Sequence, residues 1–167
     1  RAPGARYRQL RQALSDCLTV AQHDAESLFI LVVDDNPDDL FLIRRDLMAL
    51  GHRVACVSTA DEALEHIAQA YPDVLMTDVG LPGMDGIELL QTVRARTDGS
   101  WIPSLVFTGS LDEATQMRAL EAGADAYLCK PASRQMLHAK LGVILRLKAM
   151  QWQAEARNRE LARYRSL

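Results

Sequence analysis

The sequence predicts an α/β fold: a single parallel β-sheet with helices on both faces. Short apolar runs of the kind that buried parallel strands show lie at 28–33, 53–57, 74–76, 104–107 and 126–128. Segments with helical periodicity follow them, and this alternation of five strands with five helices is typical of a doubly wound sheet. The carboxyl ends of such strands lie along one edge of the sheet, where ligands bind in open α/β folds.

The composition is that of one globular domain with appendages. The 167 residues are 49% hydrophobic and 25% charged, and the net charge of -3 gives no general attraction to nucleic acid or membranes. The three cysteines, Cys17, Cys56 and Cys129, are odd in number and widely spaced, which favours reduced thiols over a disulfide framework. The sequence has no apolar run long enough to span a bilayer and no signal peptide, so we expect a cytoplasmic protein without membrane contact.

We expect three parts in the chain: an N-terminal helical extension at 1–27, an α/β domain at 28–148, and a helical linker at 149–167. Residues 7–20 place apolar side chains at helical spacing, but the strip is thin and rich in arginine. Because the chain starts at Arg1 rather than at a methionine, we expect it to be a piece of a longer protein.

Capping residues mark the expected helix ends. Asn36 and Pro37 suit the cap and the first position of a helix that Gly51 would end, and Thr59 with Glu62 forms a capping box for the next helix. The apolar faces of these two helices are expected at Leu40, Ile43, Leu47 and Leu50, and at Ala63, Leu64, Ile67, Ala68 and Tyr71. A third helix is marked by Ile87, Leu90 and Val93, and others are expected at 112–122 and 133–164.

Polar residues follow the strands at their carboxyl ends. Asp34 and Asp35 come after the first strand, Asp78 after the third, Thr108 after the fourth and Lys130 after the fifth. Three carboxylates in one pocket repel one another, so a hard cation is expected, and Mg²⁺ suits so few oxygen ligands. This arrangement suits phosphoryl transfer to a carboxylate, with Asp78 as the nucleophile. The alternative is that Asp78 only caps the turn that follows it.

Five elements in this order resemble the receiver domain of two-component response regulators, the chemotaxis-response-regulator-like family. They are the Asp34-Asp35 pair, Asp78 with Leu81-Pro82-Gly83-Met84-Asp85-Gly86 after it, Thr108, Tyr127 and the Lys130-Pro131 pair. The resemblance covers the chain from Leu28 to about Lys148 and implies a flavodoxin-like doubly wound (βα)5 fold.

The resemblance also implies a set of roles around Asp78. This residue would accept a phosphoryl group from a phosphohistidine on a histidine kinase or a phosphotransfer protein. Asp35, Asp78 and the backbone carbonyl of Gly80 would bind Mg²⁺, with Asp34 acting through water, and Lys130 would contact the phosphoryl group.

Thr108 and Tyr127 would be the switch residues. By this resemblance Thr108 moves to hydrogen-bond the phosphoryl group, and Tyr127 fills the space that it vacates. Gly80 and Ser110 stand at the two positions that tune the phosphoryl lifetime in the family, and Gly80 offers no side chain to orient or block water.

The last helix is expected to be too long for the domain alone, since about 30 residues would span roughly 45 Å. Beyond the domain its apolar positions alternate in steps of four and three, which gives a heptad seam at Val143, Leu147, Met150, Ala154, Arg157, Leu161 and Tyr164. We expect a parallel coiled coil that makes the chain a homodimer; a frayed tail is the alternative.

Two groups of residues are expected to have no special chemistry. The arginines near the C-terminus are interleaved with Glu155 and Glu160, which favours a solvated helix face over direct nucleic-acid binding. The four histidines, His23, His52, His66 and His138, are expected at solvated positions rather than as metal ligands.

The leading hypothesis is a phosphorylation switch that is not itself an enzyme. Its output would be a diguanylate cyclase or a histidine kinase outside this chain, with a helix-turn-helix output less favoured. One alternative is a pseudo-receiver that binds partners without phosphate, against which the complete set of acidic residues, Thr108 and Lys130 argues. Another is a phosphohydrolase with an aspartate nucleophile, but the chain has no cap insertion.

Overall fold

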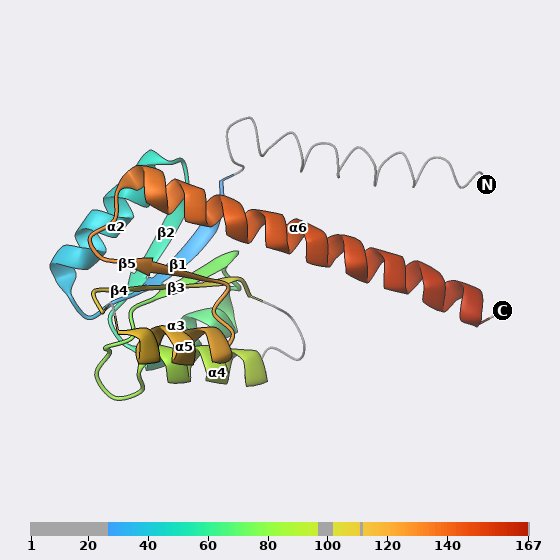
Figure 1. Ribbon diagram of the computed structural model, residues 1–167, viewed down its shortest axis with the longest axis horizontal. Helices are drawn as coiled ribbons and strands as arrows, with labels where there is room; N and C mark the ends of the chain where they lie inside the picture. The colour runs from blue at the N-terminus through green and yellow to red at the C-terminus, as the bar shows by residue number, and fades with distance from the viewer. Residues whose placement is uncertain (1–26, 97–101, 111, 167) are drawn as a thin grey trace. The chain divides into compact units, whose positions relative to one another are not determined.

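The computed structural model describes residues 27–96, 102–110 and 112–166, and this part of the chain contains one parallel sheet of five strands (Figure 1). The strands are β1 (Phe29–Val33), β2 (Arg53–Val57), β3 (Val74–Thr77), β4 (Ser104–Thr108) and β5 (Ala126–Cys129). Their order across the sheet is β2-β1-β3-β4-β5, and every neighbouring pair is parallel. The α/β, flavodoxin-like doubly wound fold predicted from the sequence is therefore confirmed.

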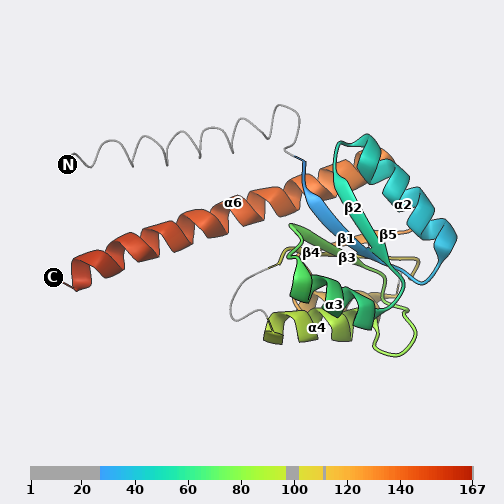
Figure 2. The ribbon, with the colours of Figure 1, turned by 180° about the vertical axis from the view of Figure 1, so that it is seen from behind.

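Five helices connect or follow the strands in the described residues. They are α2 (Pro37–Ala49), α3 (Ala60–Gln69), α4 (Gly86–Arg96), α5 (Glu113–Glu121) and α6 (Arg134–Arg165). Figures 1 and 2 show that α2 and the first turns of α6 cover one face of the sheet, whereas α3, α4 and α5 cover the other. The helix expected at 7–20 lies outside the described residues.

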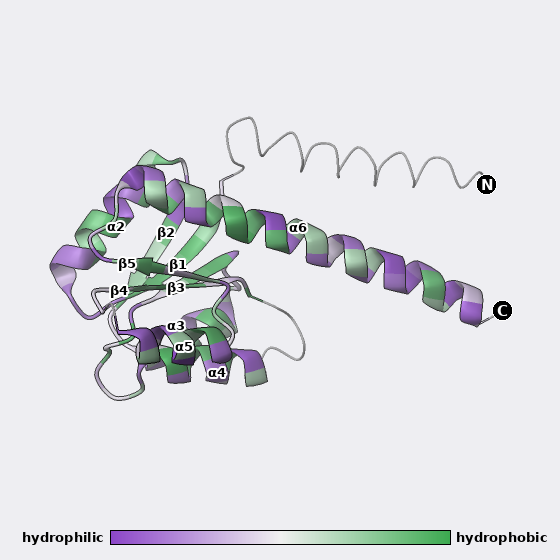
Figure 3. Ribbon diagram, viewed as in Figure 1, coloured by the Kyte–Doolittle hydropathy of each residue, from purple (hydrophilic) through white to green (hydrophobic). Residues whose placement is uncertain are grey.

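The core lies on both faces of the central strands, because side chains alternate in direction along each strand. Leu31, Val33 and Leu75 belong to a buried cluster with side chains of α3 and α4. The start of α6 contributes a stripe of three buried residues at helical spacing, Leu137, Leu141 and Ile144. Figure 3 shows the strands as mostly hydrophobic, as strands covered on both faces should be.

The described residues fall into two compact units, Ser27–Ile144 and the part of α6 from Leu145 onward. Helix α6 continues without interruption past Ile144 to Arg165. None of the helices in the described residues is both long and apolar enough to cross a membrane.

Three residues predicted to begin or end helices do so in the structure. The Asn36 side chain accepts hydrogen bonds from the backbone N–H groups of Asp38 and Asp39, and Thr59 Oγ1 accepts one from Glu62. Gly51 follows α2 with a φ of 91°, a conformation that L side chains rarely adopt.

The predicted apolar face of α3 is wrong at its C-terminal end. Helix α3 stops at Gln69, and Ala70 has the extended conformation, so Tyr71 leaves the helical spacing and is exposed. Ala68 is exposed as well.

The solvated position predicted for His52 is also wrong. His52 is 6% exposed, and its Nδ1 accepts a hydrogen bond from the backbone N–H of Leu28 at 3.2 Å, where the chain enters β1. Burial lowers the pKa of His52, and the nearby His138 lowers it further, so the neutral ring that this bond requires is favoured. His138 is exposed as predicted, and His23 lies outside the described residues.

Two aspartates connect the amino-terminal ends of neighbouring strands through the same pattern of hydrogen bonds. Asp73 donates its backbone N–H to the Phe29 carbonyl, and its side chain accepts the Phe29 N–H, both at 2.8 Å. Asp125 makes the same pair of hydrogen bonds with Ser104, again at 2.8 Å. We call these two pairs of bonds the aspartate clamps; one joins β1 to the start of β3, and the other joins β4 to the start of β5.

Asp73→Ala should lower the free energy of unfolding by about 1–3 kcal/mol, because it leaves the partly buried Phe29 N–H without its acceptor. Urea unfolding would measure the change. Glu65→Ala, which removes an exposed carboxylate from α3, is the control and should change stability by less than about 0.5 kcal/mol. Equal stabilities of the two variants would contradict the clamp.

Candidate functional site

The acidic residues lie where the topology places a binding crevice. The chain leaves β1 for β2 on one side and later returns to β3 on the other, so the carboxyl ends of β1 and β3 flank the topological switch point. Asp34 and Asp35 follow β1, and Asp78 follows β3. One carboxylate oxygen from each of these three residues lies within 4.8 Å of the others. The structure thus brings together the three carboxylates singled out in the sequence.

The ammonium group of Lys130 lies among these carboxylates. Its Nζ donates to Asp78 Oδ2 at 3.0 Å, to Asp34 Oδ2 at 2.5 Å and to Asp39 Oδ2 at 2.9 Å. An ammonium group has three N–H donors, so all three have carboxylate partners. Asp39 was not predicted as a site residue, because its place in the first turn of a helix already accounted for a negative charge.

Burial and charge act in opposite directions on the ionisable groups of this cluster. Burial raises the pKa of Asp34, and its hydrogen bonds with Lys130 and the Asn36 N–H offset this rise only in part. Burial alone would lower the pKa of Lys130, but hydrogen bonds to Asp34, Asp39 and Asp78 outweigh it and raise that pKa above its ordinary value of 10.5. The ammonium is therefore charged at neutral pH. Its stabilising contribution is complete below pH 10.5 and is lost as the pH rises beyond that value.

The loop after Asp78 packs closely against the Asp78 backbone. Asp78 Oδ1 accepts the Val79 N–H at 2.7 Å, and the Val79 carbonyl accepts the N–H groups of Leu81 and Gly86 at 3.0 and 2.9 Å. Gly86 lies so close to Asp78 that a Cβ there would be 1.8 Å from the Asp78 carbonyl oxygen. Only glycine fits this turn. The Asp78 side chain does accept a hydrogen bond within the turn, as expected if it only caps this turn. Its other oxygen, Oδ2, accepts a hydrogen bond from Lys130.

The Gly80 carbonyl belongs to the same loop. Gly80 is exposed, and the backbone hydrogen bonds of the loop end on Val79, one residue earlier. Within the described residues no loop hydrogen bond ends on the Gly80 carbonyl, so this oxygen is available as a ligand.

Thr108 and Tyr127 both contact Ser110. Thr108 ends β4, is 5% exposed, and its Oγ1 accepts the Ser110 N–H at a long 3.5 Å. The Tyr127 hydroxyl donates to the Ser110 carbonyl oxygen at 2.5 Å, and its ring packs against the buried cluster. Burial raises the pKa of Tyr127, so the hydroxyl keeps its proton. The two predicted switch residues are therefore linked through one short loop.

The donor set of the cluster fits a hard divalent cation. Asp34 is buried, Asp35 is exposed and Asp78 is half-buried, so the three oxygens open toward solvent on the Asp35 side. A set of carboxylate oxygens with room for water is what Mg²⁺ prefers, and Zn²⁺ sites in contrast use mainly nitrogen and sulfur.

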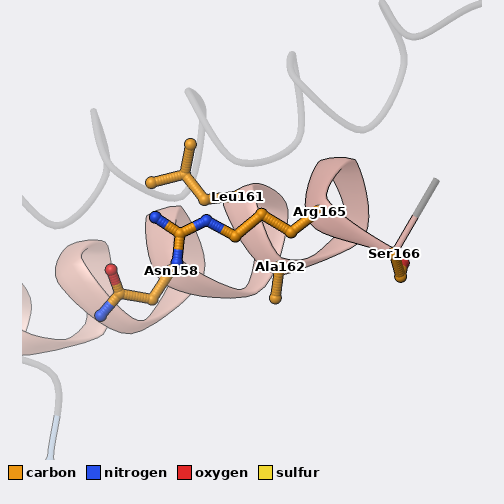
Figure 4. Close-up of a pocket in the computed structure, with 5 residues that line it drawn as sticks. All are labelled: Asn158, Leu161, Ala162, Arg165 and Ser166. Atoms are coloured by element: carbon orange, nitrogen blue, oxygen red, sulfur yellow. The ribbon is translucent and has the colours of Figure 1, made fainter.

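A pocket elsewhere in the described residues has different chemistry. Figure 4 shows its lining on the last turns of α6 and the residue after it, formed by Asn158, Leu161, Ala162, Arg165 and Ser166. None of these side chains is a carboxylate, an imidazole or a thiolate, so the pocket lacks the negatively charged donor set of the cluster at the strand ends.

Comparison with known proteins agrees with this geometry. Residues 30–142 match the family described as the response regulator receiver domain. The chain is 35% identical over 117 residues to the transcriptional regulatory protein BaeR of Escherichia coli, covering 70% of this chain and 48% of BaeR. It is 36% identical over 117 residues to the phosphate regulon transcriptional regulatory protein PhoB of Rhizobium meliloti, covering 70% of this chain and 52% of PhoB. The chain thus spans about half the length of these curated relatives.

Solved structures show the same likeness. The receiver domain of the sensor histidine kinase PA1611 of Pseudomonas aeruginosa has a TM-score of 0.66 and 29% identity, with 72% of this chain and 98% of that chain covered. That structure has a magnesium ion coordinated in its active site cleft. The chemotaxis response regulator CheY4 of Vibrio cholerae has a TM-score of 0.66 and 26% identity, with 71% and 99% covered. This chain belongs to the response regulator receiver domain family.

Proposed function

We propose that Asp78 accepts a phosphoryl group from a phosphohistidine on a histidine kinase or a phosphotransfer protein. The observation that carries the proposal is the contact of the Lys130 ammonium with Asp78 inside a cluster of carboxylates. The carboxylate is a nucleophile, and the ammonium lies where negative charge on a phosphoryl group would develop. The family relationship supports the same role, because response regulators act in phosphorelay signalling.

The proposed reaction is a displacement at phosphorus. One Asp78 oxygen forms a bond to the phosphorus atom, the P–N bond to the donor imidazole breaks, and the electron pair of that bond stays on the imidazole nitrogen. The product is an acyl phosphate on Asp78. Lys130 then moves one of its N–H donors from the Asp78 carboxylate to a phosphoryl oxygen, which holds the charge that the carboxylate has lost.

We further propose that Asp35, Asp78 and the Gly80 carbonyl bind Mg²⁺ directly, with Asp34 acting through water. Bound Mg²⁺ would neutralise charge on the phosphoryl oxygens. The three carboxylates support this because their oxygens lie within 4.8 Å of one another, and the single charge of the Lys130 ammonium does not balance three negative charges.

Incubation with acetyl phosphate tests the phosphoacceptor role. Intact-mass measurement should show one added phosphoryl group in the presence of Mg²⁺ and none after the metal is chelated, since the anionic donor must approach a cluster of negative charge. A pseudo-receiver would show no adduct under either condition. An adduct of equal yield with and without chelator would contradict the role of the cation.

Thr108 and Tyr127 are proposed to pass the change to the surface formed by β4, α5 and β5. A phosphoryl group offers Thr108 an acceptor stronger than its present 3.5 Å bond, and movement of Thr108 would shift the loop that Ser110 shares with Tyr127.

Thr108→Ala should still accept phosphate but should lose the response of this surface. The measurement is the change in amide chemical shifts of α5 on phosphorylation, which we expect to fall to less than about half of that in the unsubstituted chain. Thr92→Ala, which removes a half-buried hydroxyl that donates to the Glu88 carbonyl on α4, is the control and should respond fully. Equal responses of α5 in the two variants would show that Thr108 does not carry the coupling.

The remaining part of the proposal concerns domain organisation and output. We propose a receiver at 28–148, an extension at 1–27 and a coiled-coil linker at 149–167 that makes the chain a homodimer. The support comes from α6, which stays helical to Arg165 and exposes Leu147, Met150, Leu161 and Tyr164 along the predicted seam. Exposed apolar side chains at heptad spacing favour pairing with a second helix. A diguanylate cyclase or histidine kinase output remains a prediction.

A further inference from the structure

We propose that Asp39 is a positioning residue that shares the Lys130 ammonium with the phosphoryl site and so sets the balance between cation and anion binding there. The inference rests on the proposed function of Asp78 and adds to it a fourth carboxylate, contributed by the first turn of α2.

The geometry makes Asp39 a direct partner of the proposed phosphoryl-binding group. Asp39 Oδ2 lies 2.9 Å from Lys130 Nζ, a distance equivalent to the 3.0 Å of the Asp78 contact. The ammonium side chain is 13% exposed and the Asp39 side chain 34% exposed, so the pair lies at the mouth of the cluster and water screens it only in part. No other helix residue in the described chain makes an ion pair with Lys130.

The charge of Asp39 acts in opposite senses on the two ligands. It attracts a divalent cation to the cluster, and it also draws the Lys130 ammonium toward α2, away from Asp78. An anionic phosphoryl group on Asp78 then meets a more negative field and competes with Asp39 for the same ammonium. Neutralising Asp39 should therefore weaken Mg²⁺ binding and strengthen binding of a phosphoryl-like anion.

Asp39→Asn provides the test, with Asp38→Asn as a matched control. Asp38 is the preceding residue in the same helical turn, is exposed, and makes no ion pair in the described structure; its substitution changes the net charge by the same amount. Mg²⁺ affinity is measured by calorimetry without an anion. Beryllofluoride affinity is then measured by fluorine NMR with Mg²⁺ saturating for each variant.

Asp39→Asn is expected to bind Mg²⁺ roughly 3- to 10-fold more weakly and beryllofluoride roughly 3- to 10-fold more tightly, since one unit charge is removed from the ammonium group that contacts Asp78. Asp38→Asn should change either affinity by less than about 2-fold because water screens the exposed charge. Opposite changes in the two affinities identify an effect of charge, because a structural defect would weaken the binding of both ligands.

Three other results would count against the inference. If Asp39→Asn binds both Mg²⁺ and beryllofluoride more weakly, Asp39 has only a structural role, and the proposal is wrong. If Asp39→Asn and Asp38→Asn behave alike, the contact with Lys130 has no specific role. If the unsubstituted chain binds neither Mg²⁺ nor beryllofluoride, the proposed function itself fails, and the role of Asp39 fails with it.

Discussion

Asp78→Asn should abolish the phosphoryl adduct completely. An amide has no anionic oxygen to attack phosphorus, and no other carboxylate in the cluster is held against the Lys130 ammonium by the same loop. The acetyl phosphate reaction followed by intact-mass measurement should show the unmodified mass alone. The substitution relieves repulsion among the carboxylates but also weakens one of the three contacts of Lys130, so the temperature of unfolding should change little.

Two comparisons make this result specific to Asp78. Asp38→Asn, with the same change in charge near the cluster, should still acquire one phosphoryl group. In the unsubstituted chain hydroxylamine should remove the adduct, because it cleaves acyl phosphates and leaves phosphate esters of serine and threonine intact. An adduct that persists in Asp78→Asn would mean that another residue is the acceptor.

Leu147→Asp and Leu161→Asp should each dissociate the proposed homodimer. Both leucines are exposed on the seam, and a carboxylate in a two-stranded interface would meet its symmetry copy without a partner charge. Ala154 and Arg157 weaken the middle of the seam, so the parent dimer is expected to be only micromolar. We expect each substitution to raise the dissociation constant by about 100-fold or more, measured by sedimentation equilibrium.

Trp152→Asp is the matched control for the seam. Trp152 is 53% exposed on the same helix but stands between seam positions, so its replacement should change the dissociation constant far less. All three variants should still be phosphorylated on Asp78. An unsubstituted chain that stays monomeric at high concentration, with and without beryllofluoride, would contradict the dimer, as would equal weakening by all three substitutions.

Local chemistry in the sequence was sufficient to predict the fold. Apolar runs such as 28–33 are long enough for one strand and too short for a buried helix, and residues such as Asn36 and Gly51 mark where helices begin and end. The candidate site followed from topology, because parallel strands with helical connections bring their carboxyl ends together even when Asp34 and Lys130 are 96 residues apart.

Two of the differences from the prediction concern side chains whose environment depends on distant segments, and a third concerns a local helix end. His52 stands in a turn, where histidine is commonly solvated, but its Nδ1 is the acceptor for Leu28, 24 residues earlier. The negative charge of Asp39 was already explained by its place in the first turn of a helix. Only the three-dimensional structure reveals its contact with Lys130. Tyr71 continued a helical pattern past the point where the backbone leaves the helix.

The aspartate clamps lie at the amino ends of the strands and are therefore separate from the candidate site at the carboxyl ends. Asp73 and Asp125 use their charge to hold backbone N–H groups, whereas Asp34 and Asp78 face other charges at the opposite ends of the strands. In a library of substitutions, the effect of each change should therefore depend on the strand end at which it lies. Changes at the amino ends should lower the temperature of unfolding and leave turnover of the proposed acyl phosphate intact. Changes at the carboxyl ends should alter this turnover and change the temperature of unfolding little. If Asp78 carries the proposed acyl phosphate, its lifetime can change through residues at the carboxyl ends without a loss of folding stability.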